Sequence, residues 1–495
     1  MAVINVSNLT FAYDGNYDNI FENVSFQIDT DWKLGFTGRN GRGKTTFFNL
    51  LLNKYEYGGS ISAPCSFEYF PYEVSDKSVS TIDIACKICP EYQQWELVRE
   101  LNLLELDEEV LSRPFDSLSN GEQTKVLLVI LFLKQNSFLL IDEPTNHLDT
   151  HGRAAVRNYL NRKKGFILIS HDRAFLDGCI DHILSINKSN IEIQQGNFSS
   201  WLVNKERQDS FELAENEKLK KDIERLSASA KRTSGWSDNA EKAKYATKNS
   251  GLRPDRGYVG HKAAKMMSKA KNIENRQNKA IEDKSGLLKN IESSESLKIV
   301  QPAYHTKRLI SLDDVSIYYG EKTACQNISF TVEQGDRIAL CGKNGSGKSS
   351  IIKAILGEEI TCTGNIQKGN NLILSYVSQD TSFLNGNLSD YALECAIDES
   401  LFKAILRKLD FSRTQFEKDM KDFSGGQKKK ILIAKSLCEK AHLLLWDEPL
   451  NFVDVISRIQ IEELLLQSNP TVLFVEHDSI FCDKIATKKV LLGCQ

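Results

Sequence analysis

The sequence contains no hydrophobic run long enough to cross a membrane. Its longest unbroken apolar stretch, residues 126–133, has eight residues and lies between Lys125 and Lys134. Because a bilayer-spanning helix needs about 20 apolar residues, the sequence predicts no transmembrane segment. Residues 1–25 also lack a basic segment followed by an apolar one, so we expect no secretory signal peptide.

Paired cysteines and excess charge are equally scarce. The 11 cysteines include one C-x-x-C pair, Cys86 and Cys89, whereas a zinc or iron–sulfur site would need a second pair. We therefore expect reduced thiols in a cytoplasmic protein. The net charge of −3 argues neither for nor against nucleic acid, and 41% hydrophobic with 26% charged residues is typical of globular proteins. A length of 495 residues predicts about three domains.

What the sequence does contain is an internal duplication. Five features of residues 1–200 recur in residues 305–495 at offsets of 304–306. They begin at Tyr13 and Tyr319, Gly38 and Gly342, Ser119 and Ser424, Asp142 and Asp447, and Ser170 and Glu476. The sequence therefore predicts two copies of one fold, residues 1–200 and 305–495, separated by an insert, residues 201–304.

Each half has the pattern of an α/β domain with a mostly parallel sheet. Short apolar runs, Lys33–Thr37 and Arg337–Cys341, lead through glycine loops into helical patterns, Lys44–Leu52 and Lys348–Leu356. Further apolar runs suit strands that are buried on both faces: Phe138–Ile141, Leu443–Trp446, Ile167–Ile169 and Val472–Val475. Stronger alternation around Phe26 and Phe330 favours an additional antiparallel portion.

The two glycine loops match the phosphate-loop pattern G-x-x-x-x-G-K-[ST]. Glycines let backbone N–H groups turn onto the α- and β-phosphates, while Lys44 and Lys348 reach the β- and γ-phosphates. The Thr45 and Ser349 hydroxyls are expected to bind Mg²⁺. The predicted ATP-binding residues are Gly38, Arg39, Asn40, Gly41, Arg42, Gly43, Lys44, Thr45 and Thr46, and Gly342, Lys343, Asn344, Gly345, Ser346, Gly347, Lys348, Ser349 and Ser350.

Acidic residues end a later apolar strand in both halves. We expect Asp142 and Asp447 to hold Mg²⁺ and the following glutamates to polarise an attacking water. A histidine at the end of the next strand is expected to contact the γ-phosphate, although a buried structural histidine is the alternative. The predicted catalytic residues are Glu143, Glu448, His171 and His477.

A second candidate anion site opens a helix in each half. Its motif is Ser-x-Gly followed by Glu or Gln, and the N–H groups and dipole of a helix N-terminus attract anions. Because each half already has a phosphate loop, this second site needs another phosphate to bind. Its predicted ATP-binding residues are Ser119, Gly121 and Glu122 in the first half, and Ser424, Gly426 and Gln427 in the second.

Together these motifs resemble the ATP-binding cassette (ABC) superfamily. The resemblance implies that each Ser-x-Gly motif, the signature, closes over the nucleotide held by the other half, which gives two composite sites. It also implies that Tyr13 and Tyr319 stack on adenine, although core tyrosines are the alternative. Gln379 fits a glutamine that the family offers to Mg²⁺, whereas the first half has Tyr72 at that place. Since a phenol is a poor Mg²⁺ ligand, we predict slower hydrolysis at the first phosphate loop.

The insert carries two helical patterns and a basic centre. Residues 204–231 and 261–291 each have a thin apolar seam, which predicts an antiparallel helical hairpin with an interruption at residues 233–260. Between Leu226 and Asn272, 11 basic and three acidic residues give a charge of +8. A solvated face is the alternative, but we expect contact with nucleic acid. The predicted RNA- or tRNA-contacting residues are Lys242, Lys244, Lys248, Leu252, Arg253, Arg256, Tyr258 and Lys262.

The two cassettes, the basic insert and the motif Asp-Glu-Pro-Thr-Asn-His-Leu-Asp ending at Asp149 resemble the ABC-F translation factors over essentially the whole chain. The second-half motif ending at Asp454 and the opening Phe-Ala-Tyr-Asp-Gly resemble the antibiotic-resistance branch, especially its Lsa type. The interval from Tyr72 to Ser119 is 47 residues, against 45 in the second half. That interval leaves no room for the arm that housekeeping members insert there.

This resemblance implies a ribosome-protection ATPase that uses ATP and Mg²⁺. The closed protein would enter the ribosomal E site, where its insert would displace the P-site tRNA and dislodge antibiotics from the peptidyl-transferase centre. The expected drugs are lincosamides, streptogramin A compounds and pleuromutilins. The expected partners are the bacterial 70S ribosome, its 23S and 5S rRNA, and a P-site initiator or peptidyl tRNA. The chain itself is expected to be a monomer, cytoplasmic and ribosome-associated, without membrane contact.

Three alternatives stay open at this point. A housekeeping ABC-F factor would act on stalled ribosomes, and the missing arm argues against it. The energising subunit of a membrane transporter would lack a long basic insert. A repair or recycling ATPase would carry the cysteine-ligated metal domains that this sequence does not have.

Overall fold

The structure is a computed structural model. It describes residues 2–13, 19–146, 148–187, 190–245, 265, 268, 271–272, 276, 297, 299–320, 322–343 and 345–493. Contacts divide the chain into two compact units, residues 1–201 with 296–495, and Leu202–Glu295, and each is described by itself. The first unit contains both halves of the duplication, here called the first cassette (residues 1–200) and the second cassette (residues 305–495). These domain boundaries remain the ones predicted from the sequence.

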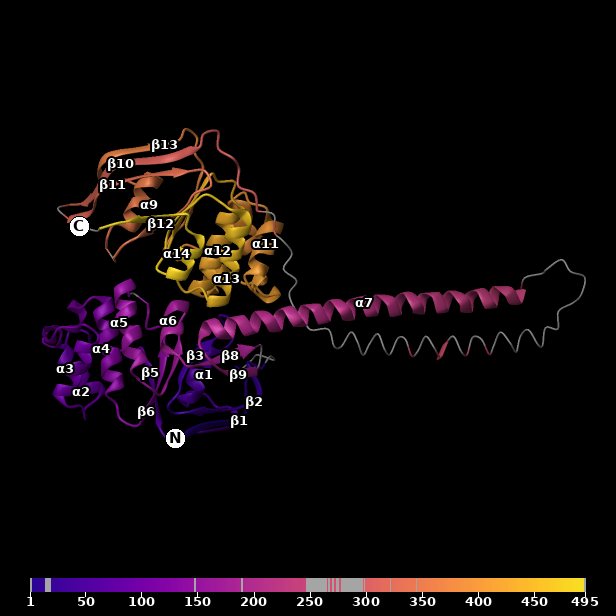
Figure 1. The fold of residues 1–495 in the computed structure, drawn as a ribbon, viewed down its shortest axis with the longest axis horizontal. Helices are drawn as coiled ribbons and strands as arrows, with labels where there is room; N and C mark the ends of the chain where they lie inside the picture. Colours follow the sequence, from indigo (N-terminus) through magenta and orange to yellow (C-terminus); the bar gives the residue numbers. More distant parts are fainter. Residues whose placement is uncertain are drawn as a thin grey trace, which may run out of the picture. The chain divides into compact units, whose positions relative to one another are not determined.

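The first cassette has a six-stranded sheet in the order β5-β6-β7-β3-β8-β9 and a three-stranded sheet in the order β2-β1-β4 (Figure 1). The larger sheet is parallel except for β9, and the smaller sheet is antiparallel. The strands are β1 (Val3–Phe11), β2 (Phe21–Asp29), β3 (Lys33–Thr37), β4 (Gly58–Ser62), β5 (Ser66–Phe70), β6 (Ser137–Asp142), β7 (Phe166–Ile169), β8 (His182–Asn187) and β9 (Asn190–Gln195). The α-helices are α1 (Lys44–Leu51), α2 (Thr81–Ile88), α3 (Gln94–Leu103), α4 (Asn120–Phe132), α5 (Thr150–Asn161) and α6 (Arg173–Cys179).

The second cassette repeats this plan. Its five-stranded parallel sheet has the order β14-β15-β16-β12-β17, and its antiparallel sheet has the order β11-β10-β13 (Figure 1). The strands are β10 (Arg308–Tyr319), β11 (Lys322–Glu333), β12 (Arg337–Cys341), β13 (Thr361–Lys368), β14 (Leu374–Val377), β15 (Leu443–Asp447), β16 (Val472–Val475) and β17 (Lys488–Leu491). The α-helices are α9 (Lys348–Leu356), α10 (Leu388–Glu394), α11 (Glu399–Lys408), α12 (Gly425–Cys438), α13 (Val455–Ser468) and α14 (Ser479–Ile485).

The predicted fold class, two α/β domains with mostly parallel sheets, is confirmed. The central strands β7 and β16 are buried along their whole length, as continuous apolar runs require. Strands β3 and β12 have the predicted bounds, and helix α1 ends one residue before the predicted Leu52. Phe26 and Phe330 lie in the antiparallel strands β2 and β11, again as predicted.

The segment between strand β5 and helix α4 of the first cassette is helical, and so is the segment between β14 and α12 of the second. Helices α2 and α3 are followed by the 3₁₀ turns Glu108–Leu111 and Phe115–Ser117. Helices α10 and α11 are followed by the 3₁₀ turns Arg413–Glu417 and Met420–Asp422. All residues of 71–119 are described, and they contain no additional helical arm.

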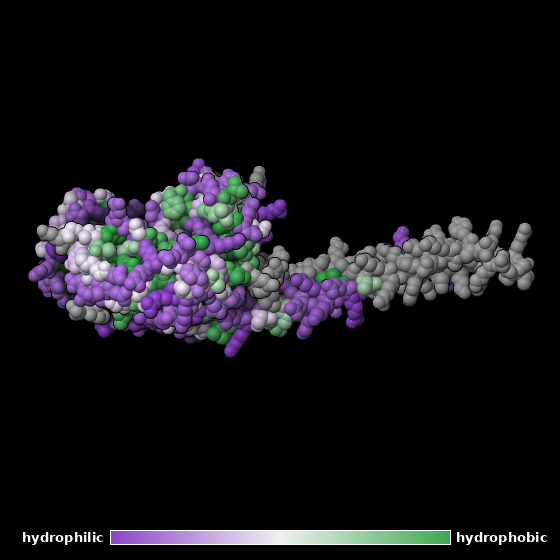
Figure 2. All heavy atoms as spheres, turned by 90° about the horizontal axis from the view of Figure 1, so that it is seen from above, coloured by the Kyte–Doolittle hydropathy of each residue, from purple (hydrophilic) through white to green (hydrophobic). Residues whose placement is uncertain are grey.

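Helix α7 (Phe198–Tyr245) corrects the prediction for the insert. The break expected at residue 233 is wrong, because one helix of 48 residues continues to Tyr245 (Figure 1). The stretch is rich in alanine, lysine and glutamate, which favour helix, and its single glycine, Gly235, costs only about 1 kcal/mol. The described side chains of α7 form a mostly hydrophilic surface (Figure 2). No helix in the described part of the chain is both long and apolar enough to cross a membrane.

The remaining predictions for the insert concern residues that are largely not described. Lys242 and Lys244 are part of helix α7. The predicted contact residues Lys248, Leu252, Arg253, Arg256, Tyr258 and Lys262 lie outside the described residues. The second predicted helix, residues 261–291, is described at five positions, all of which are helical. The predicted hairpin pairing therefore stays a prediction.

Candidate functional site

The two phosphate loops begin helices through glycines that no other residue replaces easily. Gly43 and Gly347 cap helices α1 and α9 with φ angles of 97° and 83°. A Cβ atom on Gly43 would lie 2.5 Å from Ile20 Cγ2, so the loop also requires a residue without a side chain at this position. By contrast, a Cβ on Gly41 or Gly345 would meet no atom within 4 Å, which leaves open space at the loop tips. Asn344 lies outside the described residues.

Both loop lysines lie folded over the loop. Lys44 Nζ donates to the carbonyl oxygens of Gly38 and Arg39 at 2.6 and 3.2 Å. Lys348 Nζ donates to the equivalent oxygens of Gly342 and Lys343, both at 2.9 Å. Burial lowers the pKa of each lysine. Each ammonium group is thus held at the mouth of a loop of backbone N–H groups, which suits polyphosphate.

A hydroxyl and a carboxylate meet beside each loop. Ser349 Oγ donates to Asp447 Oδ1 at 3.0 Å, and the Thr45 hydroxyl bonds the Asp142 carboxylate. Burial raises the pKa of both aspartates. In the described part of the chain no group of three or more His, Cys, Asp and Glu residues could hold a metal. A single carboxylate and a hydroxyl still fit Mg²⁺, which keeps waters and takes its other oxygens from phosphates.

The predicted catalytic glutamates share a strained backbone but have different partners. Glu143 and Glu448 have φ angles of 51° and 48°, a left-handed conformation that is uncommon for a non-glycine residue. Glu448 Oε2 accepts hydrogen bonds from the amide groups of Gln379, at 2.8 Å, and Asn451. Among the described residues, no hydrogen-bond donor reaches Glu143 Oε1. The two carboxylates therefore have unequal environments although their motifs are the same.

The pKa values of the glutamates differ accordingly. Burial, followed by the nearby Asp142 charge, raises the pKa of Glu143 to about 8. Burial also acts on Glu448, but the neighbouring His477 imidazole and the hydrogen bond from Gln379 outweigh it and lower its pKa. His477 Nε2 lies 3.7 Å from Glu448 Oε1, and His171 Nε2 lies 3.4 Å from Glu143 Oε1. Each predicted histidine thus faces its predicted glutamate.

The signatures form capping boxes at the starts of α4 and α12. The Ser119 N–H donates to Glu122 Oε2 at 2.8 Å, and the Ser424 N–H donates to Gln427 Oε1 at 2.9 Å. The return bond in each box, from the N–H of residue 122 or 427 to the serine Oγ, measures 3.3 Å. Each helix start is therefore firmly set by its own sequence, so its dipole has a fixed direction.

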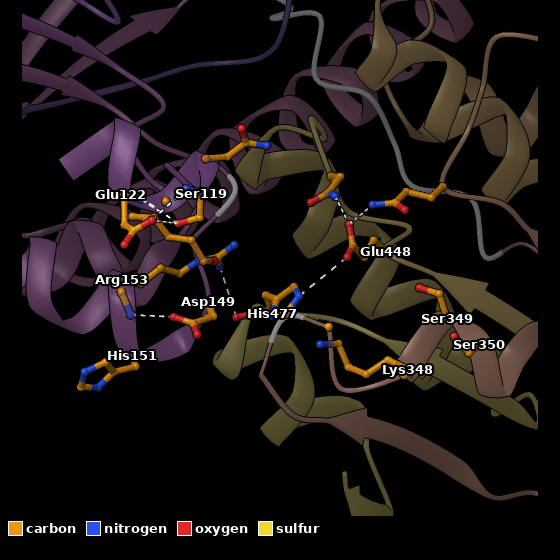
Figure 3. A pocket seen from close by; sticks show the side chains of 18 of the residues that line it. Ser119, Glu122, Asp149, His151, Arg153, Lys348, Ser349, Ser350, Glu448 and His477 are labelled. Carbon is orange, nitrogen blue, oxygen red and sulfur yellow. Dashed lines mark hydrogen bonds and ion pairs between the residues drawn. The ribbon is translucent and has the colours of Figure 1, made fainter. Parts of the chain in front are cut away.

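The structure brings each phosphate loop together with the signature of the other cassette. We call the larger cavity the Lys348 site. It has a volume of about 1140 Å³ and lies between the two cassettes (Figure 3). The residues predicted from the sequence that line this cavity are Ser119, Gly121, Glu122, Tyr319, Gly345, Gly347, Lys348, Ser349, Ser350, Gln379, Glu448 and His477.

The smaller cavity has a volume of about 390 Å³ and is lined by Asn40, Gly41, Ser424, Gly425, Gly426 and Phe452. It covers the tip of the first phosphate loop and the second signature, but Lys44, Glu143 and His171 do not line it. We call the first phosphate loop with these residues the Lys44 site. Asn40 Nδ2 donates to the Phe452 carbonyl oxygen at 2.9 Å, which joins the first phosphate loop directly to the second cassette. Arg39 and Arg42, predicted as ATP-binding, also form ion pairs with Asp410 of the second cassette.

The two predicted adenine-stacking tyrosines occupy equivalent positions. Tyr13 Oη lies 2.9 Å from Thr46 Oγ1, and Tyr319 Oη donates to Ser350 Oγ at 3.1 Å. Their exposed fractions are 37% and 51%, so the alternative of core tyrosines is wrong. Stacking on adenine stays a prediction.

Sequence reasoning missed several residues at these sites. Arg153 and Asn451 line the Lys348 site, and Phe452 lies at both cavities. Arg153 has a counterpart, Arg458, at the same offset of 305 that relates the aspartate motifs. That repetition was the available signal, because an arginine outside a known motif otherwise resembles any surface charge.

Comparisons with known proteins agree with this geometry. The sequence model of the family described as "ABC transporter" matches residues 21–146 and 325–451. The "Ribosome protection protein VmlR" of Bacillus subtilis is 28% identical over 99% of this chain and 87% of its own length. The "Erythromycin resistance ATP-binding protein MsrA" of Staphylococcus epidermidis is 28% identical over 96% of this chain and 93% of its own.

Among solved structures, the archaeal ribosome recycling factor aABCE1, in complex with the ribosomal stalk protein aP1, is similar to this chain with a TM-score of 0.63. The similarity covers 99% of this chain and 88% of that one, at 19% sequence identity. At this identity the likeness concerns the fold alone.

Proposed function

Because this chain belongs to the ATP-binding cassette family and is an ATP hydrolase of its F branch, we propose that it protects ribosomes from antibiotics. In this proposal the ATP-closed chain binds the ribosomal E site. The insert, residues 201–304, then displaces the P-site tRNA and dislodges lincosamides, streptogramin A compounds or pleuromutilins from the peptidyl-transferase centre. Hydrolysis of ATP releases the protein.

One observation carries the proposal: the same chain combines two composite nucleotide sites with a helix of 48 residues that continues from the first cassette. At 1.5 Å per residue such a helix extends about 72 Å. Its sequence continues into the segment of charge +8, which favours phosphate-rich partners. The name of VmlR gives ribosome protection and that of MsrA gives erythromycin resistance, which together support a role in antibiotic resistance.

Closure of the cassettes follows from the chemistry of the two sites. Each phosphate loop lies opposite a helix N-terminus of the other cassette, and both attract anions. ATP with Mg²⁺ supplies the negative charge that both sides need, so its binding should draw the cassettes together. Hydrolysis removes the covalent link between the γ-phosphate and the nucleotide, after which the cassettes can separate.

The principal alternative is a housekeeping translation factor of the same branch. The described helical segment between Phe70 and Ser119 matches that of the second cassette element by element. Because that segment has no additional arm, the resistance branch is favoured. A transporter subunit is disfavoured because it has no use for the basic insert.

The test is co-sedimentation of the Glu143→Gln/Glu448→Gln double variant with ribosomes in the presence of ATP. Slow hydrolysis should hold the closed chain on the particle, and raising the salt concentration should release it, because Lys and Arg contacts to phosphate release counterions. The Lys44→Ala/Lys348→Ala variant, which cannot hold the phosphates, is the control and should stay in the supernatant. A double variant that also stays there would refute ribosome binding.

A second arm of this experiment separates drug resistance from ribosome binding. Replacement of residues 253–259 by a Gly-Ser turn of equal length should abolish drug tolerance in cells while ATPase activity is retained. Unchanged tolerance would exclude residues 253–259 from the mechanism and favour the housekeeping role.

A further inference from the structure

We infer that Arg153, in the first cassette, is a positioning residue for hydrolysis at the Lys348 site, where it holds the main chain of His477 in the second cassette. The inference rests on the proposed catalytic roles of Glu448 and His477. It adds a residue from the opposite cassette that lies outside the phosphate-loop and signature motifs.

The Arg153 guanidinium joins three loops at the interface. Its Nε donates to the Leu148 carbonyl oxygen at 3.1 Å, which anchors it to the loop that follows the first Asp-Glu motif. Its Nη1 donates to Asp172 Oδ2 at 3.0 Å. The same Nη1 donates to the His477 carbonyl oxygen at 3.2 Å (Figure 3). One guanidinium therefore contacts the histidine loops of both cassettes. The side chain is largely buried, with 17% exposed, so its orientation is restricted.

The contact completes the support of the His477 peptide. The His477 N–H donates to Glu476 Oε2 at 3.1 Å, and Glu476 Oε1 accepts from the Leu450 N–H at 2.7 Å. The N–H group of His477 is therefore held by residues of its own cassette. The carbonyl oxygen of His477 accepts its hydrogen bond from Arg153 of the other cassette. That bond can form only when the cassettes meet. Closure thereby sets the direction of the imidazole, which lies 3.7 Å from Glu448 Oε1 and needs a small shift to bond it.

The equivalent arginine of the second cassette does not make this contact. Arg458 repeats the first two bonds, with Nε to the Val453 carbonyl oxygen at 3.0 Å and Nη1 to Asp478 Oδ2 at 3.2 Å. Its Nη2, however, donates to the Leu450 carbonyl oxygen of its own cassette at 3.0 Å. The described contacts include no hydrogen bond from Arg458 to the main chain of His171. Support in trans is therefore a property of the Lys348 site.

The experiment measures each nucleotide site separately in the full chain. In a Glu143→Gln background turnover depends on Glu448, and in a Glu448→Gln background it depends on Glu143. Arg153→Gln should lower kcat about tenfold in the first background, because misdirected catalytic groups cost rate. The KM for ATP should stay within about twofold, because Arg153 is not part of a phosphate loop or signature. Arg153→Lys, which keeps the charge but lacks the fork, should give an intermediate rate.

Arg162→Gln, at the exposed end of the same helix α5, is the matched control and should leave both rates unchanged. A loss in single-turnover rate confined to the Glu143→Gln background supports the inference. An unchanged kcat there, or an equal loss in both backgrounds with a lower melting temperature, would overturn it, because either result describes a general interface contact. The proposed site roles fail separately: if Glu448→Gln does not reduce total turnover, the assignment of Glu448 itself is wrong.

Discussion

The two predicted nucleotide sites contain the same motifs, yet they differ in the cavity beside the phosphate loop and in the hydrogen bonds to their predicted catalytic glutamates. The cavity of about 1140 Å³ at the Lys348 site is lined by Lys348, Glu448 and His477, whereas the cavity of about 390 Å³ at the Lys44 site is lined by neither Lys44 nor Glu143. The Lys44 site is also bridged by the bond from Asn40 to Phe452. Glu448 accepts two side-chain amide bonds, and Glu143 Oε1 accepts none from the described residues. The repeated motifs thus set where the elements lie, while hydrogen bonds that differ between the two halves set the state of each site.

The environments of the glutamates favour different protonation states. Burial raises the pKa of Glu143 to about 8, which favours its protonated form, whereas the pKa of Glu448 is lowered. A protonated carboxyl cannot accept a proton from water, so Glu448 is better prepared as a general base. This agrees with the slower hydrolysis predicted from Tyr72 at the Lys44 site.

The largest expected effect comes from removing one glutamate at a time. Glu448→Gln should lower steady-state turnover about 10³-fold, since it removes the prepared base from the faster site. Glu143→Gln should retain more than half of the turnover. Phosphate release in single-turnover and steady-state assays would measure both variants, with nucleotide binding as the control for folding. Equal losses in the two variants would show that the sites are functionally alike.

The sequence predicted the parts of these sites that depend on local pattern. The glycine loops, the strands that end at Asp142 and Asp447, and the capped signature helices follow from residue types at short spacing. The resemblance supplied the pairing of each loop with the opposite signature. Both kinds of information make the two sites look alike, apart from Tyr72 at the place of Gln379.

Contacts between the cassettes could not be predicted in the same way. The bonds of Asn40 to Phe452 and of Arg153 to His477 join residues that are 412 and 324 positions apart. They depend on how two folded surfaces meet, and no spacing in one sequence encodes that. The break predicted at residue 233 was wrong for another reason: it was placed where the apolar seam of the first helical pattern ends, whereas the helix itself continues to Tyr245.

The second prediction concerns an ion pair between the cassettes that has no counterpart at the equivalent positions of the duplication. Arg173, next to the histidine loop of the Lys44 site, pairs with Glu462 of the second cassette, which also accepts from Lys484 at 3.0 Å. At the corresponding positions of the opposite halves, Arg157 and Ser479 cannot form such a pair. Glu462→Ala should cost about 3 kcal/mol, because the buried Arg173 is left without its main partner.

Thermal unfolding would measure this loss, expected as a melting temperature lower by about 5–10 °C. The neighbouring Glu463, which is exposed, provides the matched control: Glu463→Ala should change the melting temperature little. Similar values for the two variants would mean that the pair does not stabilise the interface, and the tighter Lys44 site would need another explanation.

The smallest expected effect tests the residue that first distinguished the sites. Tyr72→Gln, in a Glu448→Gln background, should raise the single-turnover rate of the Lys44 site about fivefold. Gln379 shows the reason, since its amide donates to Glu448 at 2.8 Å, and one such bond to a carboxylate contributes about 1 kcal/mol. Tyr72 is 40% exposed, so the substitution should not disturb the core. Tyr72→Phe removes the hydroxyl without adding an amide and should give no gain. If both variants behave alike, the phenol is not what slows this site, and the difference must come from its closure.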